Sequence, residues 1–146
     1  MIASDGSTIW DNSYSQSSNW PAWTSIDDPS PIGWRVPSYE ELQKLSAAPH
    51  KWTRINGIKG LKFGLDENSI FLPTGSWRNE SGQLVSTTSD MGGDCGKYWS
   101  STYYVDGYYY TNAARALSFI ESGEGYHQEN QFYFRASGIY IRCVAK

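Results

Sequence analysis

The sequence predicts an α+β domain in which one or two short helices accompany a twisted antiparallel sheet and long loops. One convincing helix start occurs, at Ser38–Glu41. Short apolar segments separated by turn residues follow it, as in antiparallel sheets. The chain then ends in a segment that alternates with period two, Ile139–Val144. A length of 146 residues suits one domain, and no linker divides residues 1–146.

The helix begins with a capping box. The Ser38 hydroxyl can accept from the Glu41 amide while the Glu41 carboxylate accepts from the Ser38 amide. Leu42 and Leu45 then share one helical face, and Pro49 ends the helix near Ala47. We therefore assign the acidic residues here to capping and to the helix dipole rather than to catalysis.

Strands are expected on both sides of the helix. Gly33–Pro37 is extended before it, and Glu80–Gly82 forms a hairpin tip after it. The remaining expected strands lie within Gly60–Phe63, Ser69–Pro73, Gly75–Arg78, Gln83–Ser86, Lys97–Thr102, Ala116–Ile120 and Ile139–Val144. The last of these is expected to pair inside a sheet, with Ile139, Ile141 and Cys143 on one face.

Composition excludes two classes of partner. The net charge of −3, without a Lys/Arg cluster, argues against nucleic acid. No apolar run approaches the roughly 20 residues of a membrane span, so direct membrane insertion is not expected. The first residues, Met1–Asp5, show no secretion signal. Residues 1–26 are expected to form an irregular arm packed on the domain, held by Trp10, Trp20 and Trp23.

Tyrosine is concentrated in the last third of the chain. Nine of the eleven tyrosines lie from Tyr98 onward, and Tyr103–Tyr110 holds five of them. A tyrosine ring offers a large rigid contact surface and a hydroxyl at little entropic cost, which is why binding loops favour it. A core rarely needs so many polar-tipped rings together, because each buried hydroxyl must find a partner. The segment therefore predicts ligand recognition.

Four ordered motifs resemble the Fibrobacter succinogenes major paralogous domain family. They are Gly33–Ser38, Asn68–Pro73, Tyr98–Thr102 and Ile141–Val144, and together they span residues 27–145. This resemblance implies a C-type lectin-like fold, related in architecture to formylglycine-generating enzymes and to retroelement-diversified receptor-binding proteins of phages. It also implies an extracellular, cell-surface or phage-particle location.

The chain departs from this family in its cysteines and its calcium motifs. Members often carry cysteine where this chain has Ser30, so Cys95 is the only partner left for Cys143. The two cysteines are compatible with a disulfide but do not require one. The Glu-Pro-Asn loop of calcium-dependent lectins is missing. Asp90 and Asp94 leave calcium open as a cofactor beside ordinary turn chemistry; no other cofactor is expected.

We do not expect an enzyme. The cysteine pair of the formylglycine-generating enzymes is missing, and His50 and His127 belong to no cluster with metal-ligand spacing. Nothing in the sequence pairs two carboxylates as a glycosidase requires. An unusual enzyme would need Cys95 or Cys143 to be a reactive thiol of low pKa.

The leading hypothesis is a ligand-binding module for a surface glycan or protein, with two variable loops before the final strand. The predicted site residues are Tyr103, Tyr104, Asp106, Tyr108, Tyr110, Asn112, Tyr126, His127 and Asn130. Codons for these residue types interconvert by changes at adenines, so the resemblance further implies hypervariability produced by a diversity-generating retroelement. The alternative is a structural or adhesive subunit of a surface assembly, in which the tyrosines pack against a neighbour in an oligomer.

Overall fold

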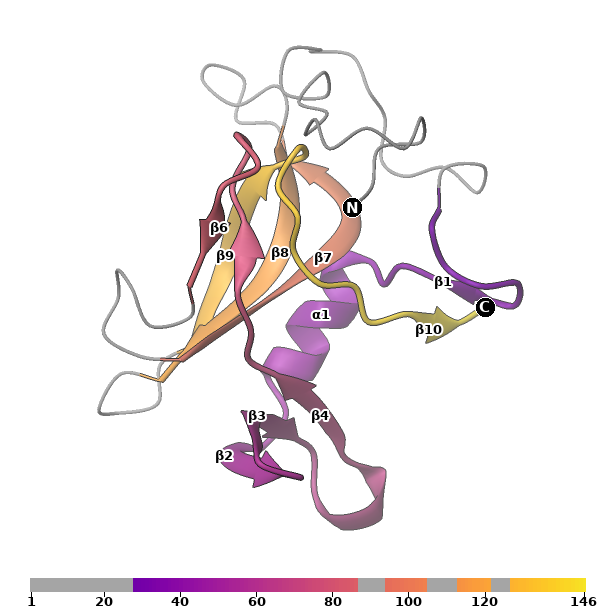
Figure 1. Ribbon diagram of the computed structural model, residues 1–146. Coiled ribbons are helices and arrows are strands. Elements are labelled where there is room, and N and C mark those ends of the chain that lie inside the picture. Colours follow the sequence, from indigo (N-terminus) through magenta and orange to yellow (C-terminus); the bar gives the residue numbers. More distant parts are fainter. Residues whose placement is uncertain (1–27, 87–93, 105–112, 122–126) are drawn as a thin grey trace.

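The structure is a computed structural model that describes residues 28–86, 94–104, 113–121 and 127–146 (Figure 1). For residues 66 and 127–130 the description covers the backbone. Its elements in chain order are β1 (Trp34–Arg35), α1 (Tyr39–Ser46), β2 (His50–Ile55), β3 (Ile58–Phe63), η2 (Asp66–Asn68), β4 (Ile70–Pro73), β5 (Trp77–Arg78), β6 (Leu84–Val85), β7 (Cys95–Tyr104), β8 (Ala113–Ile120), β9 (His127–Phe134) and β10 (Val144–Ala145).

The described strands form four small antiparallel sheets, which confirms the α+β class. Two of the sheets have three strands, in the orders β2-β3-β4 and β7-β8-β9, and two have two strands, β1-β10 and β5-β6. Helix α1 lies against the β7-β8-β9 sheet, and the β2-β3-β4 sheet continues beyond the end of the helix (Figure 1). The β7-β8-β9 sheet is therefore the central layer.

The predicted capping box of α1 is confirmed. The Glu41 amide donates to Ser38 Oγ and the Ser38 amide donates to Glu41 Oε2. Arg35 adds two bonds of 2.6 Å to the same carboxylate. Bonds from Arg35 and from the Ser38 amide together lower the pKa of Glu41 to about 2. The helix ends at Ser46 with Ala47 as its C-cap, as expected from the following Pro49.

Strand β2 was missed by the sequence prediction, although its hairpin carries a strong signal. Residues 50–55 pair with 58–63 around the two-residue turn Asn56-Gly57, and both turn residues have positive φ, 51° and 81°. Asn-Gly is the favoured pair for such a turn because its residues tolerate positive φ. The mixed polar sequence of β2 hid the strand, since four of its six residues are exposed.

The core lies between the β7-β8-β9 sheet on one side and helix α1 together with the β2-β3-β4 sheet on the other. It contains Leu42, Leu61, Phe63, Leu72, Tyr98, Leu117 and Phe119, all buried. The ring of Phe119 packs against the Tyr98 ring at 6.0 Å and directly over Gly96, where a Cβ atom would overlap it. The Tyr98 hydroxyl donates to the Pro73 carbonyl at 2.7 Å, which joins the two three-stranded sheets.

The predicted strand at Ile139–Val144 is wrong for most of its length. Tyr140 makes only an isolated bridge to Tyr98, and strand pairing resumes at Val144 in β10. Residues 138–144 bond in turn to β5, β7 and β1, so this stretch cannot stay paired with one strand. Its alternation still orders the side chains, because Ile141 is half-buried while its neighbours Tyr140 and Arg142 are exposed.

Both cysteines are free in the structure, so the disulfide that the sequence left open is not formed. Cys95 is buried at the start of β7, and Cys143 is half-buried just before β10. The predicted N-terminal arm, residues 1–26, lies outside the described residues. No described helix has both the length and the apolar character needed to cross a membrane.

Candidate functional site

The tyrosine-rich segment begins on a strand rather than in a loop. Tyr103 and Tyr104 are the last two residues of β7, and they pair with Ala114 and Ala113 at the start of β8. A register shift between Trp99 and Tyr103 marks a bulge just before them. Bulges bend a strand and redirect the side chains that follow. The Tyr103 side chain is 51% exposed, the largest exposure of any described tyrosine.

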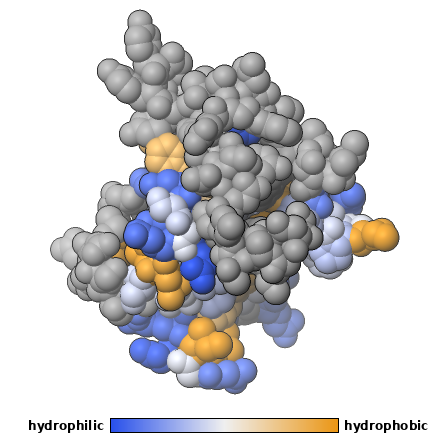
Figure 2. All heavy atoms as spheres, turned by 45° about the horizontal axis from the view of Figure 1, so that its top comes forward, coloured by the Kyte–Doolittle hydropathy of each residue, from blue (hydrophilic) through white to orange (hydrophobic). Residues whose placement is uncertain are grey.

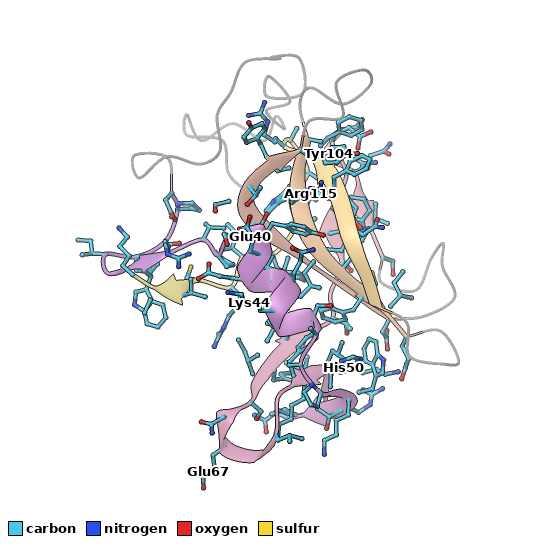
Figure 3. All side chains as sticks on the ribbon, turned by 180° about the vertical axis from the view of Figure 1, so that it is seen from behind. Glu40, Lys44, His50, Glu67, Tyr104 and Arg115 are labelled. Carbon is cyan, nitrogen blue, oxygen red and sulfur yellow. The ribbon has the colours of Figure 1, made fainter. Side chains whose placement is uncertain are left out.

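Tyr104 is held in a stack of aromatic and cationic groups. Its ring lies parallel to the Phe132 ring, with centroids 4.2 Å apart. The Arg115 guanidinium carbon lies 4.6 Å from the Tyr104 ring centre and 4.9 Å from that of Tyr39. Figure 3 shows Arg115 and Tyr104 at one end of the sheet, beside the first turn of α1. These contacts order the helix-facing side of this end of the sheet, whereas the side chain of Tyr103, one residue earlier on β7, projects from the opposite face.

Helix α1 holds the Tyr39 ring of this stack in place. Tyr39 is the first residue of α1, and its amide donates to Thr102 Oγ1 on β7 at 3.0 Å. Ser100 Oγ donates to the Arg115 carbonyl at 2.8 Å, which ties β7 to β8 at the same level. Because α1 is fixed at its start by the capping box, the Tyr39 ring is held beside Arg115 by elements distant in sequence.

The predicted site residues divide into three groups. Tyr103 and Tyr104 are described in full. His127 and Asn130 are described by their backbone, and it lies in strand β9 rather than in the predicted loop. The others lie outside the described residues: Asp106, Tyr108, Tyr110, Asn112 and Tyr126.

The backbone separates the two predicted binding segments. Tyr104 pairs with Ala113 and His127 pairs with Phe119, so they meet opposite ends of β8. Six residues of strand separate those pairing points, or about 20 Å. The sequence predicts two variable surfaces, Tyr103–Asn112 and Tyr126–Gln131, and the strand directions place their described ends apart. A compact ligand at Tyr104 would not reach the His127 backbone.

A second cluster surrounds a buried lysine. Lys97 is only 7% exposed, and its ammonium lies 3.6 Å from the Trp77 ring centre and 4.4 Å from that of Tyr133. Among the described residues no carboxylate lies within 4.0 Å of it. Burial, against a smaller opposing effect of Cys95, lowers the pKa of Lys97 to about 8. Among the described residues, the faces of these two rings provide the main electrostatic attraction for the ammonium.

Cys95 does not meet the condition that we set for an enzyme. Burial raises the pKa of Cys95, which keeps it a thiol rather than a nucleophilic thiolate. The carboxylate of Asp94 faces the ammonium of Lys59 at 3.3 Å, and Glu121 contacts the same ammonium. Lys59 thus supplies the positive charge at Asp94 that the calcium alternative assigned to an ion. Asp90 lies outside the described residues.

A small hollow lies between α1 and β8, beside the Tyr39 ring that contacts Arg115. Its volume is only about 10 Å³, and it is lined by Tyr39, Leu42, Gln43, Ser46, Ala116 and Leu117. Small-molecule sites usually occupy roughly 300–1,000 Å³. The hollow is therefore too small to hold a typical ligand by itself, and the end of the sheet remains the better candidate.

Neither Arg115 nor Tyr39 belongs to the site that the sequence predicts. Two signals existed. Arg115 occupies the side of β8 that its neighbours Leu117 and Phe119 share at spacings of two. An arginine on a strand face otherwise occupied by apolar residues needs an explanation. Tyr39, three residues before Leu42, falls on the buried face of the helix.

Comparison of the chain with known protein families, with curated proteins and with solved structures finds no match.

Proposed function

We propose that the protein is a non-enzymatic ligand-binding module with a C-type lectin-like scaffold, which recognises a surface glycan or protein through the tyrosine-rich end of its central sheet. One observation carries this proposal. Tyr103 is 51% exposed at the end of β7, a strand whose next residue, Tyr104, is fixed in a stack with Phe132 and Arg115 on the opposite face of the sheet. An exposed ring on a rigid strand binds at a low entropic cost, because the strand is ordered before the ligand arrives.

Chain connectivity supports the same end of the sheet. Residues 105–112 join β7 to β8, and they include Asp106, Tyr108, Tyr110 and Asn112. Connections between strands tolerate sequence change better than the strands themselves, so they suit a variable binding surface. We propose that this connection is diversified by a retroelement and that the protein acts outside the cell, on a cell surface or on a phage particle.

The test uses one tyrosine variant and a matched aromatic control. Binding to glycan and protein arrays, with and without calcium, is measured for the unaltered protein and for Tyr103→Ala. Trp34→Ala removes an aromatic side chain of similar exposure, 48%, from β1. We expect Tyr103→Ala to weaken binding by about 10-fold or more without lowering Tm, and Trp34→Ala to leave binding unchanged. Equal binding by all three proteins would refute the site.

Variability is tested separately. Sequencing the 3′ end of the gene across a natural population should show substitutions concentrated at adenines in codons 103–112. Tyr104 is stacked on Phe132 and Arg115, so we expect fewer substitutions there than at Tyr103. Uniform sequences across the population would leave a binding module of fixed specificity and would remove the retroelement from the proposal.

A structural subunit of a surface assembly is the second candidate. At the tip of the β2-β3 hairpin Ile55 and Ile58 pair with each other and are 44% and 55% exposed. Figure 2 shows hydrophobic side chains at several separate places on the described surface. An oligomer in analytical ultracentrifugation that Ile55→Ser with Ile58→Ser dissociates, in a protein that binds no array ligand, would favour this candidate.

A further inference from the structure

Arg115 differs from Arg35, Arg54 and Arg78 in its contacts. Arg35 pairs with Glu41, Arg54 donates to the Gly57 carbonyl, and Arg78 donates to the Gly82 carbonyl. Each of these guanidinium groups is satisfied within its own part of the chain. For Arg115, the contacts among the described residues are the faces of Tyr39 and Tyr104.

The surroundings of Arg115 leave its hydrogen-bonding capacity unused by the described residues. No described carboxylate lies within 4.0 Å of its guanidinium, and no described oxygen accepts from its side chain. The residue is half-buried on β8, the middle strand of the central sheet. Aromatic faces attract the charge, but they accept no strong N–H bonds in the plane of the group. The geometry therefore stabilises the cation and leaves its five N–H donors for a ligand.

A carboxylate is the group that best fits such a donor set. The planar guanidinium donates two parallel bonds to the two oxygens of a carboxylate, and its orientation must be fixed for both to form. The stack of Phe132, Tyr104 and Arg115, with Tyr39 held by α1, provides that orientation. We propose that Arg115 is the anion-binding residue of the ligand site and that the ligand is a glycan containing a sugar acid. This inference rests on the proposed function and adds the ligand's chemical class.

The covered edge of β7 favours a sugar acid over an acidic peptide. Peptides often bind by adding a strand to a free sheet edge. Here the Trp99 amide donates to the Tyr140 carbonyl, and the Ser101 amide donates to the Pro37 carbonyl. The Tyr140 amide in turn donates to the Lys97 carbonyl. These bonds occupy the outer edge of β7 as far as Ser101, so a peptide strand cannot add there, whereas a sugar acid needs no free strand edge to reach Arg115.

The test compares an acid with its neutral ester. The probes are trigalacturonate, its trimethyl ester and a tetraglutamate peptide, each titrated calorimetrically into the full chain. We expect trigalacturonate to bind at least about 10-fold more tightly than the ester, the usual value of a charge-assisted bond pair. Arg115→Gln should remove that difference. Arg115→Lys, which keeps the charge but loses the planar fork, should retain only part of it.

A matched control separates local from general charge effects. Arg54→Gln removes the same charge from β2, at the far end of the molecule from Arg115 (Figures 1 and 3). It should leave the preference for the acid intact. Circular dichroism melting of each variant establishes that it is folded, and the Nε–Hε NMR signal of Arg115 should move on addition of the acid in the unaltered protein.

The outcomes separate this inference from the proposed function. Equal binding of acid and ester, or an Arg115→Gln protein that still prefers the acid, overturns the role of Arg115. Binding of tetraglutamate alone overturns the sugar class, and binding of no probe overturns the inference. In each case the array experiment with Tyr103→Ala decides the proposed function independently, because that readout does not depend on ligand charge.

Discussion

Replacement of Lys97 by methionine should change how the stability of the protein depends on pH. Lys97 is 7% exposed on β7, and its ammonium faces the rings of Trp77 and Tyr133. Burial lowers its pKa from an ordinary value of 10.5 to about 8. The native state therefore binds the proton less tightly than the unfolded state does, and keeping Lys97 charged costs stability at neutral pH.

The size of the effect follows from that pKa difference. The full difference corresponds to at most roughly 3 kcal/mol. Attraction of the ammonium to the two rings offsets about 1 kcal/mol of this desolvation free energy. Residual contact with solvent reduces the rest. We expect the pH-dependent part to be about 1–2 kcal/mol. It is present in full below pH 8 and disappears as the pH rises from 8 toward 10.5, because native Lys97 becomes neutral in that range.

Urea denaturation at pH 7.0 and at pH 9.5 measures this difference. The stability of Lys97→Met relative to the unaltered protein should fall by about 1 kcal/mol or more between the two pH values. Tyrosines and cysteines that titrate in this range are common to both proteins and cancel. Lys51→Met, at an exposed position of β2, gives the effect of losing one positive charge. An identical pH dependence for Lys97→Met and the unaltered protein would refute the desolvation of Lys97.

Three further predictions concern single contacts. Glu41→Gln should lower the free energy of unfolding by about 1 kcal/mol at pH 7. Because the pKa of native Glu41 is lowered to about 2, this loss should disappear as the pH falls from 4.5 to 2. Measurement of Tm across this pH range would reveal it. Gly96→Ala should lower the free energy of unfolding by about 1–3 kcal/mol, because its Cβ would overlap the Phe119 ring; an unchanged urea midpoint would contradict that packing. Cys95, a buried thiol with a raised pKa, should react with iodoacetamide only after unfolding, and rapid labelling of the native protein, mapped by mass spectrometry, would count against it.

Local signals in the sequence were sufficient for the helix and most strands. The capping box at Ser38–Glu41 forms because all of its partners lie within four residues. The hairpin tip at Glu80–Gly82 likewise joins β5 and β6, as expected. Strand β2 was missed because most of its residues are polar and exposed, yet its Asn56-Gly57 turn was a readable signal.

What the sequence by itself determined is the class of the domain and the identity of its tyrosine-rich segment, because both depend on neighbours in the chain. Tertiary structure alone decided the candidate site. Arg115 meets Tyr39 across 76 residues of sequence and Tyr104 across the β7-β8 pairing. It also decided that Tyr104 and His127 meet opposite ends of β8. Contacts between elements depend on strand order and direction, which no local pattern encodes.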